Sequence, residues 1–179
     1  MALRPWKKLS EAAVSPNPWW TYRRDIVERP GGSQGEYHYV DSRGSAMIVP
    51  LLPDGRILAV NQYRYLAGKE SIEFPCGSLK EGTDHGETAA TELKEETGYV
   101  ASSIKQIGEF NPYNGVTNEL CRVFLAEGLT FAGAEPEETE EFEMVPLRPE
   151  EIDSKISDGT IWDGMTIAAW YLVCLKRAL

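Results

Sequence analysis

ELKEETG, residues 92–98, places three carboxylates within five positions of one another. In a helix, Glu92, Glu95 and Glu96 stand at i, i+3 and i+4 and therefore share one face. Like charges at this spacing repel each other and destabilise an isolated helix. Two explanations are open: a solvated acidic surface that tolerates the repulsion, or a site whose partner is a cation.

The residues around this stretch predict a helix. Thr83 or Asp84 can act as the N-cap, and Gly98 fits the position just after the C-terminus. An apolar stripe suited to packing is formed by Ala89, Ala90 and Leu93. A second helix is expected near the C-terminus, in residues 158–179, where helical periodicity ends with Lys and Arg.

Strand-like segments precede and follow the first helix. NPWWTYRRDIVERPGG (17–32) and GEYHYVDSRG (35–44) predict two strands that can pair as a hairpin. SAMIVPLLPDGRILAVNQYRYL (45–66) contains a Pro-Asp-Gly turn between two β-rich runs, which predicts another hairpin. Further strands are expected in residues 71–79, 104–114 and 120–130, followed by an acidic loop (133–143) and the segment MVPLRPEEI (144–152). This order indicates an α+β fold with a mixed sheet.

Composition bounds the class of protein. The chain has 179 residues, 42% of them hydrophobic and 26% charged, as in a soluble globular domain. Its net charge of −10 argues against binding a nucleic-acid backbone, which requires clustered Lys and Arg. Small phosphorylated substrates remain open where metal ions supply positive charge.

Cysteines, histidines and apolar runs suggest a location. Three cysteines (Cys76, Cys121 and Cys174) without a paired short spacing argue against a disulfide framework or zinc knuckle. Two histidines are too few for a histidine-based metal site. The N-terminus lacks an apolar signal segment, and IAAWYLVCL near the C-terminus is too short for a membrane span. We therefore expect a cytoplasmic protein without a membrane partner.

GSLKEGTDHGETAATELKEETGY, residues 77–99, resembles the Nudix box, Gly-x5-Glu-x7-Arg-Glu-aliphatic-x-Glu-Glu-x-Gly-aliphatic. The matching residues are Gly77, Glu92, Leu93, Glu95, Glu96 and Gly98, with Tyr99 at the final apolar position. Thr83 replaces the first Glu and Thr91 replaces the Arg. In the family these two can pair, so their joint loss leaves no orphan charge. We interpret the two departures as changes to the scaffold.

Flanking segments resemble one branch of the family, the ADP-ribose and nucleoside-diphosphate-sugar pyrophosphatases. These segments are NPWWTYRRDIVERP (17–30), NQYRYLAGKESIEFPCG (61–77) and EETEEFEMVPL (137–147). The resemblance implies a Nudix α/β/α sandwich (44–179) after an N-terminal β extension (1–43) that serves dimerisation and base binding. It also implies a homodimer that hydrolyses the pyrophosphate of ADP-ribose or a nucleoside-diphosphate sugar, giving a nucleoside monophosphate and a sugar phosphate.

The resemblance assigns the metal site. Glu92, Glu95 and Glu96 are expected to hold Mg²⁺, or alternatively Mn²⁺, and the backbone carbonyl of Cys76 is a candidate further ligand. Divalent ions neutralise the charge that develops on a pyrophosphate and help to ionise the attacking water. Carboxylate and carbonyl oxygens are the ligands that Mg²⁺ prefers.

A glutamate of the acidic loop is the candidate general base, because related enzymes place one there on a mobile loop. Glu140 is our first choice, with Glu138 and Glu141 next. A base in this loop would take a proton from the attacking water. The alternative is a solvated acidic loop.

Substrate contacts are expected at two places. Arg64 can bind a phosphate in bidentate fashion or pair with Glu73, and Glu73 is either a metal or substrate ligand or that partner. Trp19 and Trp20 can stack on a base, one of them near it and the other packed, and Arg23 can contact phosphate or base.

Two other readings differ in function. The first is a Nudix hydrolase of GDP-mannose or dinucleoside polyphosphates. The second, suggested by Thr83 and Thr91, is a catalytically silent nucleotide-binding module, against which the three retained glutamates argue.

Overall fold

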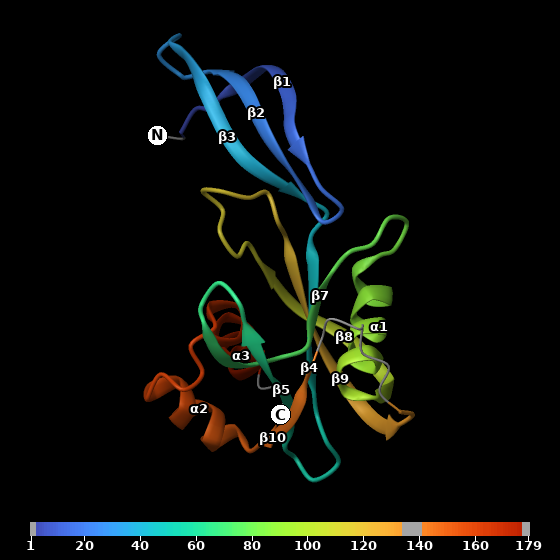
Figure 1. The fold of residues 1–179 in the computed structure, drawn as a ribbon. Coiled ribbons are helices and arrows are strands. Elements are labelled where there is room, and N and C mark those ends of the chain that lie inside the picture. Colours follow the sequence, from blue (N-terminus) through green and yellow to red (C-terminus); the bar gives the residue numbers. More distant parts are fainter. Residues whose placement is uncertain (1–2, 134–140, 177–179) are drawn as a thin grey trace. The chain divides into compact units, whose positions relative to one another are not determined.

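A computed structural model describes residues 3–133 and 141–176 of the chain (Figure 1). The chain divides into two units. The first consists of Met1–Gly44 and Asn111–Leu120, and the second of Ser45–Phe110 and Cys121–Leu179.

The first unit is a three-stranded antiparallel sheet in the order β1-β2-β3, made of β1 (Lys7–Pro16), β2 (Trp20–Glu28) and β3 (Gln34–Ser42). The hairpin predicted from residues 17–44 is confirmed, because β2 pairs with β3 from Trp20↔Ser42 to Glu28↔Gln34. Strand β1 was not predicted. All its residues are exposed, so its sequence lacks the apolar alternation by which a half-buried strand is recognised.

The second unit contains two sheets. One has the order β7-β4-β9-β8 and is mixed, since β4 runs parallel to β9 and the other pairs are antiparallel. The other is antiparallel, in the order β10-β5-β6. The strands are β4 (Ser45–Pro50), β5 (Ile57–Arg64), β6 (Lys69–Glu73), β7 (Cys76–Ser78), β8 (Tyr99–Phe110), β9 (Cys121–Phe131) and β10 (Glu143–Leu147).

The hairpin predicted for residues 45–66 is wrong. Its turn forms, with the Leu52 amide donating to the Arg56 carbonyl at 2.8 Å, but β4 and β5 then enter different sheets. All six residues of β4 are buried, which is typical of a central strand covered on both faces. A local turn signal does not determine which strands pair beyond it.

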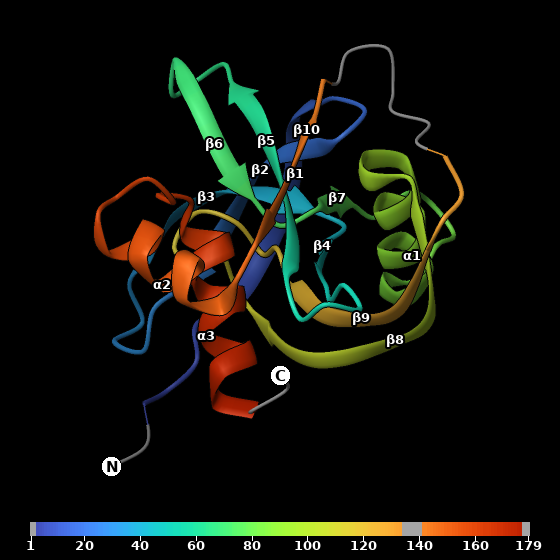
Figure 2. The same cartoon turned by 90° about the horizontal axis from the view of Figure 1, so that it is seen from below.

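Helices cover the strands of the second unit on two sides. In Figure 2, α1 (His85–Thr97) lies on one side, and α2 (Pro149–Ser157) and α3 (Gly164–Lys176) lie on the other. Helix α3 was predicted, whereas α2 was not. The α+β fold predicted above, an α/β/α sandwich, is confirmed.

The alternation of β4 divides the core in two. Ala46 and Ile48 pack in a cluster with Ala89 and Leu93 of α1. Met47 and Val49 belong to a larger cluster that includes residues of α2 and α3, such as Ile152, Ala169 and Trp170. Successive residues of a strand point to opposite faces, so this single buried strand anchors both helical layers. The position of α1 relative to β4 is thereby fixed.

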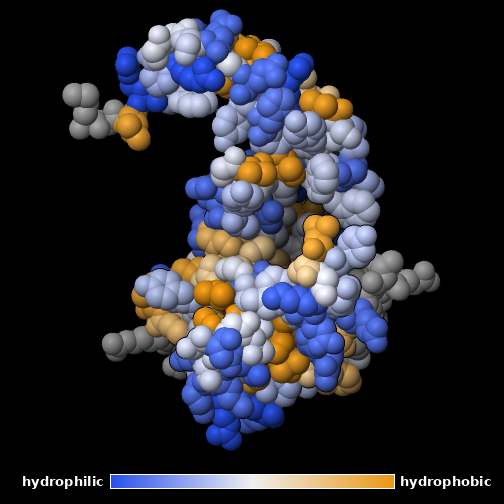
Figure 3. All heavy atoms as spheres, turned by 60° about the vertical axis from the view of Figure 1, so that its left-hand side comes forward, coloured by the Kyte–Doolittle hydropathy of each residue, from blue (hydrophilic) through white to orange (hydrophobic). Residues whose placement is uncertain are grey.

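At the surface, hydrophobic side chains form separate patches between hydrophilic ones on the face drawn in Figure 3. Within the described part of the chain, every helix is too short or too polar to cross a lipid bilayer.

Candidate functional site

Both ends of α1 are fixed by capping. Asp84 is the N-cap, and its Oδ1 accepts hydrogen bonds from the amides of Gly86 at 2.7 Å and Glu87 at 2.9 Å. The side chain of Glu87 accepts from the Asp84 amide at 3.0 Å, which completes a capping box. At the other end, Gly98 has φ of 75° and donates its amide to the Lys94 carbonyl. These caps give the acidic face of α1 a rigid support.

The three glutamates of α1 differ in burial. Glu96 is 6% exposed, whereas Glu92 and Glu95 are half-buried. The carboxylate of Glu92 lies against Gly77 of β7, in space that a Cβ at residue 77 would occupy. Gly77 itself is held in the sheet by pairing with Ala46. Gly77 and Glu92, two residues that match the motif, are therefore in direct contact.

Cys76 precedes this glycine in β7, where it pairs with Met47 of β4 and is half-buried against the larger core cluster. Its side chain thus has a packing role. The role of its backbone carbonyl as a further metal ligand stays a prediction.

The carboxylates of α1 are suitable ligands for a hard cation such as Mg²⁺. Among the described residues, no three acidic, histidine or cysteine side chains are clustered closely enough to form a metal cage. The donors are nevertheless the right kind: carboxylate oxygens on one face of a capped helix, one of them buried, and one seated in a space that only glycine leaves open. A divalent ion would relieve the repulsion between them.

Both threonines that depart from the motif have ordinary environments. Thr83 donates its hydroxyl to the Lys80 carbonyl at 2.9 Å and lies 3.3 Å from the hydroxyl of Thr88. Thr91 is exposed. Thr83 thus closes the turn before α1, while Asp84 is the residue that caps the helix.

Arg64 and Glu73 form a bidentate ion pair across β5 and β6. Arg64 Nε donates to Glu73 Oε1 at 2.9 Å, and Nη2 donates to Oε2. Glu73 is 3% exposed, while the Arg64 side chain is about half exposed. Hydrogen bonding to Glu73 raises the pKa of Arg64, against the opposing effect of burial. The ion-pair interpretation is confirmed, and the exposed part of the guanidinium stays accessible to an anion.

Thr166 has a structural role at the start of α3. It is 1% exposed, and its hydroxyl accepts from the Phe74 amide at 3.2 Å, which joins α3 to the segment after β6. Asp163 caps α3 by accepting from the Thr166 amide at 2.7 Å. The signal was present in the spacing of Asp163 and Thr166, which is typical of a helix start.

Glu141 is exposed and lies just before β10. Glu138 and Glu140, the other candidate bases, lie outside the described residues. The candidate base thus stays a prediction.

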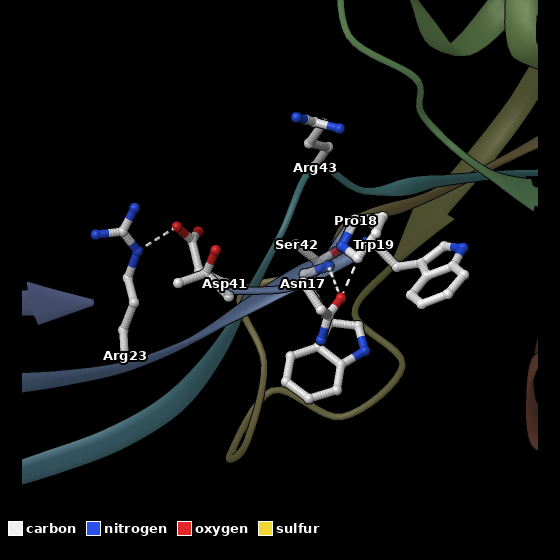
Figure 4. A pocket seen from close by; sticks show the side chains of 9 residues that line it. Asn17, Pro18, Trp19, Arg23, Asp41, Ser42 and Arg43 are labelled. Atoms are coloured by element: carbon white, nitrogen blue, oxygen red, sulfur yellow. Dashed lines mark hydrogen bonds and ion pairs between the residues drawn. The ribbon is translucent and has the colours of Figure 1, made fainter. Parts of the chain in front are cut away.

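Trp19, Trp20 and Arg23 line a common pocket of about 220 Å³ in the first unit (Figure 4). Trp19 is 71% exposed and Trp20 is 44% exposed, so neither indole is packed in the core of this unit. Both of their amides donate to Asn17 Oδ1 at 2.9 Å, which holds the turn that presents them.

Two charged residues of this pocket, Arg23 and Asp41, are held by side-chain hydrogen bonds. Arg23 donates through Nε to Asp41 Oδ2, and Asn118 Nδ2 donates to Asp41 Oδ1 at 2.6 Å. Asp41 and Arg43, which also line the pocket, were missed by the sequence analysis. The pairing of Asp41 with Asn118 joins residues 77 positions apart and leaves no local signal. Exposed indoles beside an ordered guanidinium are suited to a flat, anionic ligand.

Two family profiles match adjoining parts of the chain. The profile of the NUDIX domain matches residues 41–164. The profile described as the nucleoside diphosphate sugar hydrolase N-terminal domain matches residues 6–40.

Several proteins are similar to this chain over most of its length. An ADP-ribose pyrophosphatase of Bacillus subtilis (strain 168) is 31% identical over 155 residues, covering 86% of this chain and 84% of its own length. The methanol dehydrogenase activator of Bacillus methanolicus is 30% identical over 157 residues, covering 87% and 85%. A GDP-mannose pyrophosphatase of Yersinia enterocolitica serotype O:8 / biotype 1B (strain NCTC 13174 / 8081) is 30% identical, covering 82% of each chain. A crystal structure of an ADP compounds hydrolase superposes with a TM-score of 0.83 at 20% identity, covering 97% of this chain and 94% of its own, which supports the fold.

Proposed function

The chain belongs to the Nudix family, and from this premise we propose that it hydrolyses the pyrophosphate bond of ADP-ribose or a nucleoside-diphosphate sugar. The products are a nucleoside monophosphate and a sugar phosphate. Relatives named ADP-ribose pyrophosphatase and GDP-mannose pyrophosphatase, similar over about four-fifths of the chain or more, support this substrate class.

The observation that carries the proposal is the contact of Glu92 with Gly77 on the face of α1 that also bears Glu95 and the buried Glu96. A solvated acidic surface requires neither a glycine opposite one carboxylate nor the burial of another. A cation-binding face explains both.

We assign Glu92, Glu95, Glu96 and the carbonyl of Cys76 to a divalent ion, with Mg²⁺ as the first choice and Mn²⁺ as the alternative. When bound, the ion supplies charge neutralisation for the pyrophosphate and a more acidic water. The capped helix supplies the fixed spacing of the carboxylates. Its rigidity limits the reorganisation needed when the substrate arrives.

We assign the role of general base, which accepts the proton of the attacking water, to a loop glutamate. Glu140 is the first choice, followed by Glu138 or Glu141. Replacing each by Gln separately tests the order. Replacing the true base should lower kcat with little change in KM and should remove the acidic limb of the pH–rate profile. Equal, small effects at all three positions would contradict the assignment.

Two sets of residues are assigned to the substrate. Trp19 and Trp20 offer exposed rings for a base, and Arg23 offers its remaining N–H groups to a phosphate or base. In the second unit, we assign the half-exposed Arg64, which Glu73 orients, to the phosphate oxygens. Glu73 acts here by positioning Arg64.

We further propose a cytoplasmic homodimer. All three cysteines are thiols, which fits a reducing compartment, and exposed aromatic side chains in the first unit suit an interface. Light scattering of the purified chain tests the dimer, and a monomer at micromolar concentration would contradict it.

Side-by-side turnover with ADP-ribose, GDP-mannose and diadenosine polyphosphates, each with Mg²⁺ or Mn²⁺, tests the function. We expect the sugar-linked diphosphates to be cleaved. The GDP-mannose alternative is favoured by the Yersinia relative and would appear as a higher kcat/KM for that substrate. Binding without release of a phosphorylated product from any substrate would instead support a silent nucleotide-binding module.

A further inference from the structure

Asp25 is a buried carboxylate that the proposed reaction does not use. It lies in the middle of β2, is 8% exposed, and lines a second cavity of the first unit, of about 340 Å³. Its Oδ1 is buried and has no hydrogen-bond partner among the described residues. A buried ionised carboxylate is costly unless a donor or cation satisfies it. Asp25 is one of the residues that line a cavity large enough to hold such a group.

The charges around Asp25 do not balance. Glu11 of β1 stands directly opposite Asp25 in the sheet, where like charges repel. Lys8 is shared between them: its Nζ bonds to Glu11 and lies 3.8 Å from Asp25 Oδ2, at the limit of an ion pair. The single ammonium group of Lys8, whose side chain is about half exposed, thus serves two carboxylates. One further positive charge would neutralise the cluster.

Aromatic rings form another wall of the cavity. Tyr37 stands opposite Asp25 in β3, and Tyr39 lies beside it with ring centroids 6.4 Å apart. Tyr37 is held in place by its hydroxyl, which donates to the Gly115 carbonyl at 3.2 Å, and by an edge contact with Trp6. Ring faces beside a carboxylate attract organic cations.

The remaining wall comes from the segment 111–120 and is polar. It contributes Asn114, Thr117 and Asn118 to the cavity. The backbone of this segment is fixed to β3 by the Val40 amide, which donates to the Val116 carbonyl at 2.8 Å. Amide and hydroxyl oxygens on this wall can accept hydrogen bonds from those N–H groups of a bound cation that do not bond to the carboxylate.

We propose that this cavity is a binding site for a small organic cation, namely a primary alkylammonium. The carboxylate of Asp25 lines the cavity with, among the described residues, only a 3.8 Å ion pair to Lys8, and it favours an N–H donor, which a primary ammonium has and a quaternary ammonium lacks. The tyrosine rings cover the alkyl chain. The volume falls near the lower end of the roughly 300–1,000 Å³ of small-molecule sites, which fits a short chain.

An NMR titration of the full-length ¹⁵N-labelled chain at constant ionic strength tests the site. Butylammonium should give saturable shifts of the amides of Asp25, Tyr37 and Thr117. Butan-1-ol, which has the same alkyl chain without the charge, and tetramethylammonium, which has the charge without N–H groups, should each bind at least about tenfold more weakly. Equal binding of butan-1-ol, or shifts confined to other residues, would overturn the proposal.

Three variants separate the carboxylate from the general charge of the protein. Asp25→Asn should weaken butylammonium binding at least about tenfold, whereas Asp158→Asn, an exposed acid of the second unit, should leave it unchanged. Lys8→Gln removes the competing ammonium and should tighten binding about threefold. Unchanged binding in Asp25→Asn, or weaker binding in Lys8→Gln, would contradict the site. If Asp25→Asn does not fold, the comparison of ligands and Lys8→Gln decide the question.

Discussion

The carboxylate of Glu92 and the α-carbon of Gly77 are in such close contact that no side chain fits between them. A Cβ at residue 77 would stand 2.6 Å from Glu92 Oε2 and nearer still to Oε1 and Cδ. Gly77 is fixed by its pairing with Ala46 of β4, so the carboxylate is the group that must move. The motif therefore needs glycine at residue 77 because the carboxylate of Glu92 fills the space that a side chain there would occupy.

Gly77→Ala is therefore expected to lower kcat about 100-fold, because displacing a catalytic group by about 1 Å costs that much. The fold should persist, since the added methyl group meets the end of a flexible side chain. Steady-state kinetics over a Mg²⁺ titration measures the effect. Gly164→Ala is the matched control, because a Cβ there meets no atom within 4 Å. Normal turnover and normal Mg²⁺ dependence in Gly77→Ala would refute the proposed cradle.

Glu96→Gln should lower turnover at least about 100-fold by removing a metal ligand. The same change should raise the free energy of unfolding in EDTA, because it removes a buried like charge from the i, i+3, i+4 cluster on α1. Lower activity together with higher metal-free stability distinguishes a ligand from a structural residue. Urea unfolding and kinetics measure the two quantities.

The exposed acid Glu127 of β9 provides the control for this variant. Glu127→Gln should change neither turnover nor the free energy of unfolding by a measurable amount. A Glu96→Gln variant that keeps near-normal turnover would exclude Glu96 from the metal site.

The elements predicted correctly from sequence are those whose signals are local. Helix α1 carries its N-cap, its apolar stripe and its terminal glycine within 15 residues, from Asp84 to Gly98. The pairing of β4 depends instead on β9, more than 70 residues later, and its Pro-Asp-Gly turn gave the wrong partner. Local chemistry fixes turns and caps, whereas sheet order is decided by burial of the whole strand.

The same distinction applies to the site. The glutamates of α1 follow from helical spacing, and the pairing of Arg64 with Glu73 was an alternative drawn from residue type alone. The contact of Asp41 with Asn118 and the cavity that Asp25 lines together with the segment 111–120 depend on the connection between strands β8 and β9. Neither has a counterpart in periodicity or composition.

Arg64→Ala should lower the free energy of unfolding by about 2–3 kcal/mol, because it leaves the buried carboxylate of Glu73 without its bidentate partner. Arg56→Ala is the matched control. It breaks an ion pair with Asp54 in which both side chains are exposed, so the free energy of unfolding should fall far less than in Arg64→Ala. Urea unfolding measures both, and equal losses would contradict the structural role of the Arg64–Glu73 pair.

Combining Arg64→Ala with Glu73→Gln separates stability from substrate binding. The double variant should recover part of the lost stability, since the buried charge is removed with its partner. If Arg64 also binds phosphate, KM should stay raised in the double variant. Full recovery of both quantities would restrict Arg64 to its structural role.

The Tyr39 hydroxyl provides a test at alkaline pH. Burial is the main cause that raises its pKa above 10.0, and the negative charge of Asp25 acts in the same direction. The folded state therefore favours the neutral phenol, so this contribution to stability is complete below about pH 10 and is lost as the pH rises through the folded-state pKa. Tyr39→Phe should flatten the fall in the free energy of unfolding between about pH 9 and 11, whereas Tyr63→Phe, at an exposed phenol, should not. Asp25→Asn, which removes one cause of the shift, should give an intermediate slope. A Tyr39→Phe variant that loses stability as steeply as the wild type would show that this phenol is not desolvated beside Asp25.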